Sequence, residues 1–155
     1  MGKDLQVRPA RPSEAEAISA LCLRSKAHWG YDEAFMARAR RTLMVSAEQI
    51  GAGDVWVAET GGEIAGMVAL AKLDDPTLVD LDKLFVEPAH IGSGAGRALM
   101  SVAIQEARRR GYARMAILAD PNAATFYEKL GATFIDDRAS EAIPGRLLPY
   151  FELTL

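Results

Sequence analysis

Cysteine is almost absent from this sequence, which has only Cys22 among 155 residues. A single cysteine excludes an internal disulfide and is typical of a reducing compartment, so we expect a cytoplasmic protein. Cys22 falls on the apolar stripe of an expected helix with Ile18 and Leu21, which favours a packed core thiol over an acyl-carrying nucleophile. The sequence also lacks an apolar run near the about 20 residues of a membrane span, and we recognise no signal peptide.

An excess of either charge is missing too. Lys and Arg number 18 against 21 Asp and Glu, for a net charge of −3, so the composition gives no bulk attraction to nucleic acid. No repeat, low-complexity tract or linker interrupts the chain. Its length and its 50% of hydrophobic residues suit one core, so we expect residues 1–155 to form a single domain.

Three of the 13 glycines, by contrast, stand at alternate positions of one short turn, as Gly92, Gly94 and Gly96. An apolar strand precedes this turn and an amphipathic helix follows it. Glycine allows positive φ and close approach of the backbone to a ligand, and the free N–H groups of a helix start favour an anion such as phosphate. The spacing is neither a dinucleotide fingerprint, because Arg97 replaces the third glycine, nor a Walker loop, which needs Lys and Ser or Thr.

Hydrophobic periodicity and turn residues predict a mixed α/β domain in the order β-α-α-β-β-β-α-β-α-β-β. Ser13 is expected to cap the first helix, Gly30 to end it, and Asp32 to cap the second. The predicted elements are Leu5–Arg8, a helix after Ser13, Glu33–Met44, Asp54–Glu59, Glu63–Leu73, Thr77–Val86, Gly94–Arg110, Ala113–Ala119, Ala123–Leu130, Thr133–Asp137 and Leu147–Leu155.

Two motifs in this order resemble the signature of the GCN5-related N-acetyltransferase (GNAT) superfamily. The first reads roughly V-x-P-x-x-[RQ]-x-x-G-x-G-x-x-L-L in that family, and the second N-A-x-x-F-Y-x-K-L-G. The matching residues are Val86, Pro88, Gly94, Gly96, Leu99 and Met100 in the first motif and Asn122, Ala123, Phe126, Tyr127, Lys129, Leu130 and Gly131 in the second. One position departs from the pattern, because Ile91 stands where the family has Arg or Gln.

The resemblance implies the GNAT fold, in which a mixed, mainly antiparallel sheet is flanked by helices. It implies acetyl-CoA as co-substrate and a primary amine as acceptor, with no metal. We expect neither nucleic acid nor a membrane as a partner, and a homodimer stays open. The implied coenzyme-binding residues are Leu84, Phe85 and Val86 at the strand end, Ile91, Gly92, Ser93, Gly94, Ala95, Gly96 and Arg97 around the turn, and Asn122 and Tyr127.

Aminolysis of a thioester needs a neutral amine, and an ammonium group with a pKa of about 10.4 is neutral in only about one part in 10³ at pH 7. A carboxylate can take the proton, directly or through water. Counted back without a gap from Gly94, Asp80 falls where the histone-modifying branch of the family has its glutamate, and Asp82 shares its strand face. Either could instead be a solvated edge charge, with water alone as the base.

Tyr127 matches the family's tyrosine and is the expected acid for the departing thiolate, with packing over the coenzyme as the alternative. Asn122 is expected either to contact the coenzyme arm or to act as a helix N-cap. An aromatic group in the first helix break could line the acceptor site or pack two helices together. That group consists of His28, Trp29 and Tyr31.

Arg146 lies between the last two expected strands, where it could reach an anionic group of the acceptor or have no partner. The sequence thus predicts an N-acetyltransferase whose acceptor cannot be read from the chain. The alternative is a catalytically weak, acyl-CoA-binding sensor or regulatory domain of the same fold.

Overall fold

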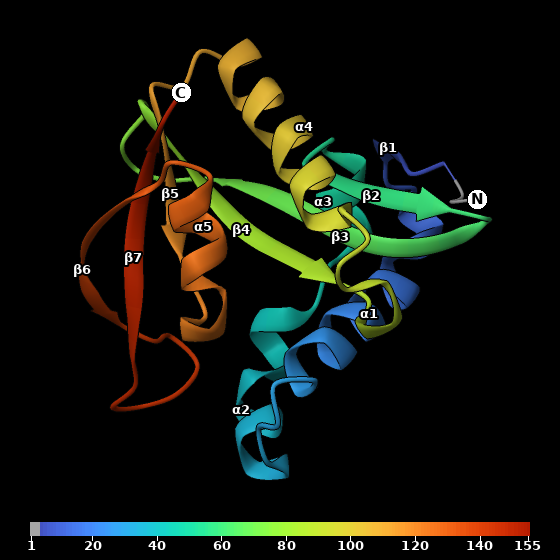
Figure 1. Cartoon of the computed structure of the whole chain (residues 1–155), viewed down its shortest axis with the longest axis horizontal. Helices are drawn as coiled ribbons and strands as arrows, with labels where there is room; N and C mark the ends of the chain where they lie inside the picture. Colours follow the sequence, from blue (N-terminus) through green and yellow to red (C-terminus); the bar gives the residue numbers. More distant parts are fainter. Residues whose placement is uncertain (1–3) are drawn as a thin grey trace. The chain divides into compact units, whose positions relative to one another are not determined.

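A computed structural model of the chain describes residues 4–155. The predicted order of elements is confirmed, with one short helix, α3, added before the second strand (Figure 1). Within these residues no helix is both long and apolar enough to cross a membrane. The elements are β1 (Gln6–Pro9), η1 (Pro12–Glu14), α1 (Ala15–Ala27), α2 (Glu33–Leu43), α3 (Ala47–Gly51), β2 (Val55–Thr60), β3 (Glu63–Lys72), β4 (Leu78–Val86), η2 (Pro88–His90), α4 (Ala95–Arg109), β5 (Arg114–Leu118), η3 (Pro121–Ala123), α5 (Ala124–Lys129), β6 (Thr133–Ala139) and β7 (Leu147–Thr154).

The strands are hydrogen-bonded in the order β1-β2-β3-β4-β5-β7-β6. β4 and β5 run parallel, whereas β1 and β2, β2 and β3, β5 and β7, and β6 and β7 run antiparallel. A parallel pair needs a long crossover, and α4 supplies it between β4 and β5. The expected mixed, mainly antiparallel sheet is therefore confirmed.

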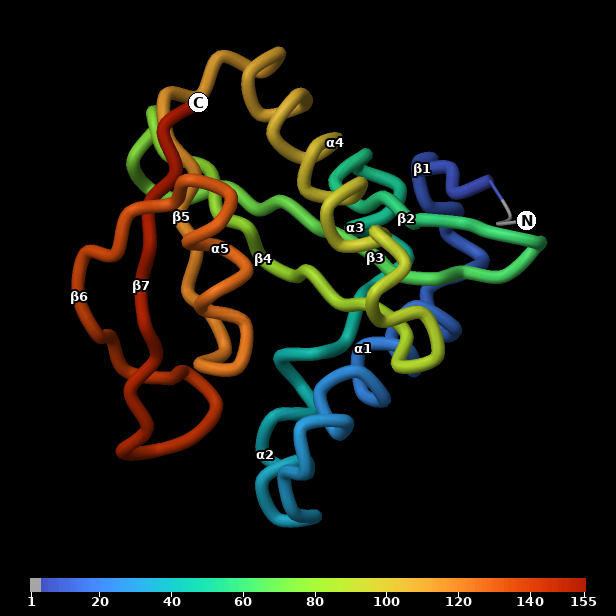
Figure 2. The backbone as a smooth tube through the Cα atoms, in the orientation of Figure 1, coloured from blue at the N-terminus to red at the C-terminus, as the bar shows by residue number. Residues whose placement is uncertain are grey.

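The described residues gather in two compact units, and Figure 2 traces the backbone through both. The first unit consists of residues 4–70 and 83–103, and the second of residues 71–82 and 104–155. The chain passes from one unit to the other within β3, β4 and α4. The expectation of one domain over residues 1–155 stays a prediction.

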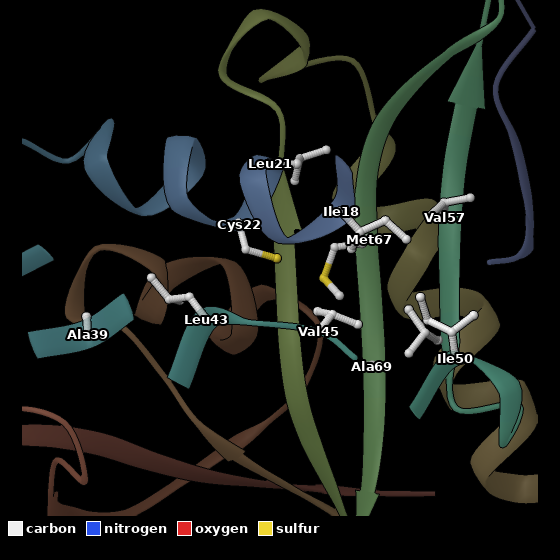
Figure 3. Packing of buried hydrophobic residues seen from close by; sticks show 11 residues of the cluster. Ile18, Leu21, Cys22, Ala39, Leu43, Val45, Ile50, Val57, Met67 and Ala69 are labelled. Carbon is white, nitrogen blue, oxygen red and sulfur yellow. The ribbon is translucent and has the colours of Figure 1, made fainter. Parts of the chain in front are cut away.

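The core of the first unit is built from one face of α1 and the inward side chains of β2 and β3 (Figure 3). Ile18, Leu21 and Cys22 recur at helical spacing and are at most 2% exposed. They meet Val57 of β2 and Met67 of β3, which are both fully buried. Cys22 is thus a packed core thiol, as its place on the apolar stripe predicted.

The start of α1 differs from the prediction. Ser13 lies inside the turn η1 and does not cap α1. The Glu14 carboxylate instead accepts the Arg11 amide at 2.8 Å and the Arg8 guanidinium at 2.8 and 2.9 Å. A charged acceptor forms the stronger bonds, and Pro12 favours a turn at this point, so the hydroxyl of Ser13 is not needed.

The second unit packs α5 against the sheet formed by β5, β7 and β6. Phe151 of β7 is 1% exposed and lies at the centre of this packing. Its ring centroid is 6.4 Å from Tyr127 of α5 and 5.8 Å from Phe134 of β6. Phe151 therefore anchors α5 on one face of the sheet, and its neighbours along β7 point to the opposite face.

Candidate functional site

The glycine turn of the first unit connects η2 to α4. Gly92 and Gly94 have φ of 85° and 90°, a region in which a side chain would be strained. The Ser93 amide donates to the His90 carbonyl at 3.1 Å, and the Ala95 amide donates to the Ser93 hydroxyl at 3.3 Å. These two hydrogen bonds within the turn stabilise its conformation.

Three other amides of the turn are free to bind a ligand. The amides of Gly94, Gly96 and Arg97 donate to no other residue in the part of the chain that the structure describes. They lie at the N-terminus of a 15-residue helix, where the helix dipole favours an anion. A Cβ added at Gly92 or Gly94 would meet nothing within 4 Å, so the turn is open on that side. The residues present therefore fit a phosphate group.

Gly66 of β3 is a residue that sequence reasoning missed. A Cβ at this position would lie 2.9 Å from the Phe85 carbonyl oxygen and 3.0 Å from the Leu99 side chain. Glycine is therefore required where β3 meets the end of β4 and the first turns of α4. A lone glycine inside an apolar strand is a known sign of close backbone approach, and that signal was available in the sequence.

The strand end before the turn is partly accessible. Leu84, Phe85 and Val86 are half-buried, and Phe85 packs against the core of the first unit. They lie beyond the β4–β5 ladder, whose register covers residues 78–80. Ile91, at the position where Arg or Gln is usual, has 52% of its surface exposed, so its side chain is not part of the core.

Tyr127 lies in the second unit, on α5, with its ring packed against Phe126 and Phe151. The residue is 6% exposed, yet its hydroxyl bonds to none of the residues that the structure describes. Since no fully buried polar atom among them lacks a partner, this hydroxyl reaches the surface. Burial, together with the nearby Asp120 carboxylate, raises the pKa of Tyr127 above its ordinary value, so the hydroxyl keeps its proton at neutral pH.

Asn122 is held by Asp120 in the turn before α5. The Asp120 carboxylate accepts the Asn122 backbone amide at 2.8 Å and its side-chain amide at 2.9 Å. The N-cap interpretation of Asn122 is therefore wrong, because Asp120 is the capping residue of η3. Arg146 also faces this group, with a guanidinium nitrogen 3.7 Å from the same carboxylate. A hairpin arginine without a partner is thus excluded.

Asp80 lies in a row of residues that crosses three strands of the second unit. The register places it opposite Ala116 of β5, which in turn lies opposite Glu152 of β7. With strands about 4.8 Å apart, the Cα atoms of the two acidic residues are separated by roughly 10 Å on one face of the sheet. Asp80 is half-buried, whereas Asp82, two residues on, is exposed.

Glu152 belongs to a polar network that the sequence did not reveal. Its carboxylate accepts the Tyr150 hydroxyl at 2.7 Å and the Arg114 guanidinium at 2.5 Å. The Arg138 guanidinium lies 3.5 Å from the centre of the Tyr150 ring. The hydrogen bond from Tyr150, with the help of Arg114, lowers the pKa of Glu152, whereas burial and Glu152 raise the pKa of Tyr150 to about 12.

The aromatic group of the first helix break splits in two. Tyr31 stacks on Phe35 of α2 with ring centroids 3.9 Å apart, and the Lys26 ammonium lies 5.2 Å from the Tyr31 centroid. Trp29 makes an edge contact with His28 and keeps 48% of its surface exposed. Tyr31 therefore packs the helix break, and Trp29 faces outward.

The chain is similar to known acetyltransferases in sequence and in fold. The family model described as "Acetyltransferase (GNAT) family" matches residues 23–132. N-acetyltransferase 8 of Mus musculus is 36% identical over 93 residues, which cover 52% of this chain and 41% of the mouse protein. N-acetyltransferase 8 of Homo sapiens is 34% identical over 83 residues, or 49% of this chain and 37% of that protein. The matched segment thus spans about two-fifths of these relatives.

Solved structures give the same fold over nearly the whole chain. The paia N-acetyltransferase from Thermoplasma acidophilum, in complex with coenzyme A, superposes with a TM-score of 0.78 at 15% identity and covers 98% of this chain and 99% of that one. The putative acetyltransferase yncA from Salmonella typhimurium, with its cofactor acetyl-CoA, gives a TM-score of 0.71 at 25% identity over 97% of this chain and 94% of that one.

Proposed function

Because this chain belongs to the GNAT family of acetyltransferases, we propose that it transfers the acetyl group of acetyl-CoA to a primary amine. The observation that carries the proposal is the set of amides at the start of α4 that have no partner among the described residues. They lie within the segment matched by the family and suit an anion. Both similar structures described above hold coenzyme A or acetyl-CoA, which supports an acyl-CoA as the co-substrate here.

The turn binds the coenzyme through its backbone. Gly94, Gly96 and Arg97 donate their amides to the pyrophosphate, and the absence of side chains on the glycines allows the phosphate oxygens to approach. Ser93 and Ala95 hold the shape of the turn. The strand end at Leu84, Phe85 and Val86 offers backbone groups to the pantetheine arm, as an added strand would.

Tyr127 acts as the acid. When the amine nitrogen bonds to the acetyl carbon, the carbon–sulfur bond breaks and the sulfur leaves as a thiolate, whose conjugate acid has a pKa near 8.5. A tyrosine hydroxyl that stays protonated at neutral pH and has no partner in the described chain is suited to donate to that sulfur. Asn122, oriented by its bonds to Asp120, contacts the coenzyme arm.

Asp80 is the proposed base that takes the amine proton, directly or through water. Glu152 shares its row and face but is less suited to the role, because Tyr150 and Arg114 occupy its oxygens and lower its pKa. The network around Glu152 is better explained as support for the strand face that presents Asp80.

Two measurements on the intact chain test this function. Calorimetric titration with acetyl-CoA should give a Kd in the micromolar range, and an acceptor screen that follows release of the free CoA thiol should find an amine that is acetylated. If acetyl-CoA does not bind in dilute buffer, the proposal is wrong. Binding without turnover over a broad panel of amines would favour the acyl-CoA-binding sensor instead.

A further inference from the structure

The helices α1 and α2 of the first unit lie side by side (Figure 1). Their side chains line an open groove. Its volume is about 450 Å³, within the range of small-molecule sites. The lining residues are Leu23, Arg24 and Ala27 of α1 and Met36, Ala37 and Arg40 of α2. Leu23 and Met36 also pack against the buried core, so the apolar floor of the groove is fixed in place.

The two arginines of the groove have different surroundings. Arg24 forms an ion pair at 2.9 Å with Glu87, which directly precedes η2 and the glycine turn. Arg40 is exposed, and it forms no ion pair or hydrogen bond with any residue of the described range. Two further exposed arginines, Arg38 and Arg41, give the C-terminal half of α2 a local excess of positive charge that the overall net charge of −3 conceals.

We propose that this groove binds a small ligand with an apolar body and a carboxylate, and that this ligand is the non-reacting end of the amine acceptor. The acceptor class is then an apolar α-amino acid or a close relative, an assignment that rests on the proposed function. The planar guanidinium of Arg40, which has no partner in the described range, suits a carboxylate. The side chains of Leu23, Met36 and the two alanines suit a branched aliphatic or aromatic group. A polycationic acceptor would meet repulsion here.

The carboxylate part of the proposal is tested by direct binding, with no coenzyme and no reaction. N-acetyl-L-leucine and N-acetyl-L-leucinamide differ in charge but hardly in shape, and each can be titrated into the protein by NMR. The acid should bind about tenfold more tightly than the amide, and Arg40→Gln should abolish that preference. Arg41→Gln is the matched control, since it removes the same charge one residue away from the groove. Equal binding of acid and amide, or equal effects of the two variants, would overturn the proposal.

The apolar part is tested by filling the groove. Ala37→Phe places a ring in it and should weaken N-acetyl-L-leucine roughly tenfold, whereas Ala34→Phe adds the same ring to an exposed position of α2 outside the lining. Circular dichroism and the thermal midpoint show whether both variants fold. An unchanged affinity in folded Ala37→Phe would place the ligand elsewhere and overturn the assignment.

Kinetics separate this inference from the proposed function. With L-leucine, L-leucinamide and 3-methylbutylamine as acceptors, Arg40→Gln should raise KM about tenfold for the acid alone and leave kcat nearly constant. Turnover of amines without any preference for the acid would refute the groove and keep the acetyltransferase. Selective binding of N-acetyl-L-leucine without turnover of any amine would refute the acetyltransferase and keep the groove as a binding site.

Discussion

The glycine turn of the first unit and the Tyr150 network of the second unit use polar groups in opposite ways. At the turn, three backbone amides have no partner in the described chain. In the network, the Tyr150 hydroxyl and the Arg114 guanidinium both bond to Glu152. A polar group without a partner costs free energy unless water or a ligand satisfies it, whereas a closed network stabilises the fold.

The same contrast divides two tyrosines of the second unit. Both rings are buried, at 6% exposure for Tyr127 and 4% for Tyr150. Within residues 4–155, the Tyr150 hydroxyl has a partner, the Glu152 carboxylate at 2.7 Å, and the Tyr127 hydroxyl has none. We infer that polar groups without a partner in the described chain serve ligand binding, whereas groups bonded within the chain serve stability. Substitutions of the first kind should therefore alter function before stability, and substitutions of the second kind should alter stability before function.

Tyr127→Phe should give the largest effect on the reaction. It removes the proposed acid but no hydrogen bond within the described chain, so turnover should fall roughly 10- to 10³-fold while the Kd for acetyl-CoA stays the same. Steady-state kinetics with an acceptor whose chemistry is slow, together with calorimetry, measure the two quantities. Tyr150→Phe is the control, and it should lower the thermal midpoint more than Tyr127→Phe does. Unchanged turnover of Tyr127→Phe would exclude the acid role.

Gly94→Ala should give the next largest effect, on coenzyme binding. Alanine at a φ of 90° is strained by about 1–2 kcal/mol, and relaxation of the turn moves the amides, so acetyl-CoA should bind roughly tenfold more weakly. Gly111→Ala is the matched control, because Gly111 has a φ of 88° and equally open surroundings but lies at the other end of α4. If both variants lose the same affinity for acetyl-CoA, the loss comes from backbone strain in general, and the glycine turn is not the binding site.

Local features were predictable from the sequence because their causes lie within a few residues. The glycines of the turn predict positive φ, which Gly92 and Gly94 adopt. Asp32 caps α2 as predicted, because its carboxylate accepts the Phe35 amide at 2.8 Å. The helix α3 was missed because five residues are too few for a periodic pattern. The sequence nevertheless contains the cap of this helix, Ser46, whose hydroxyl accepts the Gln49 amide at 3.0 Å.

Contacts across strands were not predictable, because they depend on register. Arg114, Tyr150 and Glu152 come together only when β5 and β7 align, and nothing near each residue fixes that alignment. The sequence marks Gly66 as a point of close backbone approach, but it does not identify the contacts, such as Phe85, which lie 19 or more positions away. The candidate site was therefore found where a motif marks it, and its supporting network was not.

Glu152→Gln should affect stability in a pH-dependent way. The pKa of Glu152 is lowered in the folded state, so its stabilisation is fully present above the unfolded value of about 4.3 and is lost as the pH falls through the folded value. At pH 7 the variant should lose about 1 kcal/mol, and the difference should shrink below about pH 4. Urea unfolding from pH 7 to pH 3 measures it. A gap that is constant with pH would contradict the assignment.

Ile91→Arg should give the smallest effect, and it tests whether a side chain of the glycine turn adds to coenzyme binding. It restores the residue type usual at this position, and because Ile91 is 52% exposed the new side chain can reach solvent without disturbing the core. A charge-assisted contact at such an exposed place should tighten acetyl-CoA binding only roughly twofold to fivefold, and added salt should reduce the gain. Ile135→Arg adds the same charge at a 47% exposed position of β6 and should leave the Kd unchanged. An equal gain in both variants would mean that net charge attracts the coenzyme, whereas no gain in either would mean that the backbone amides alone suffice.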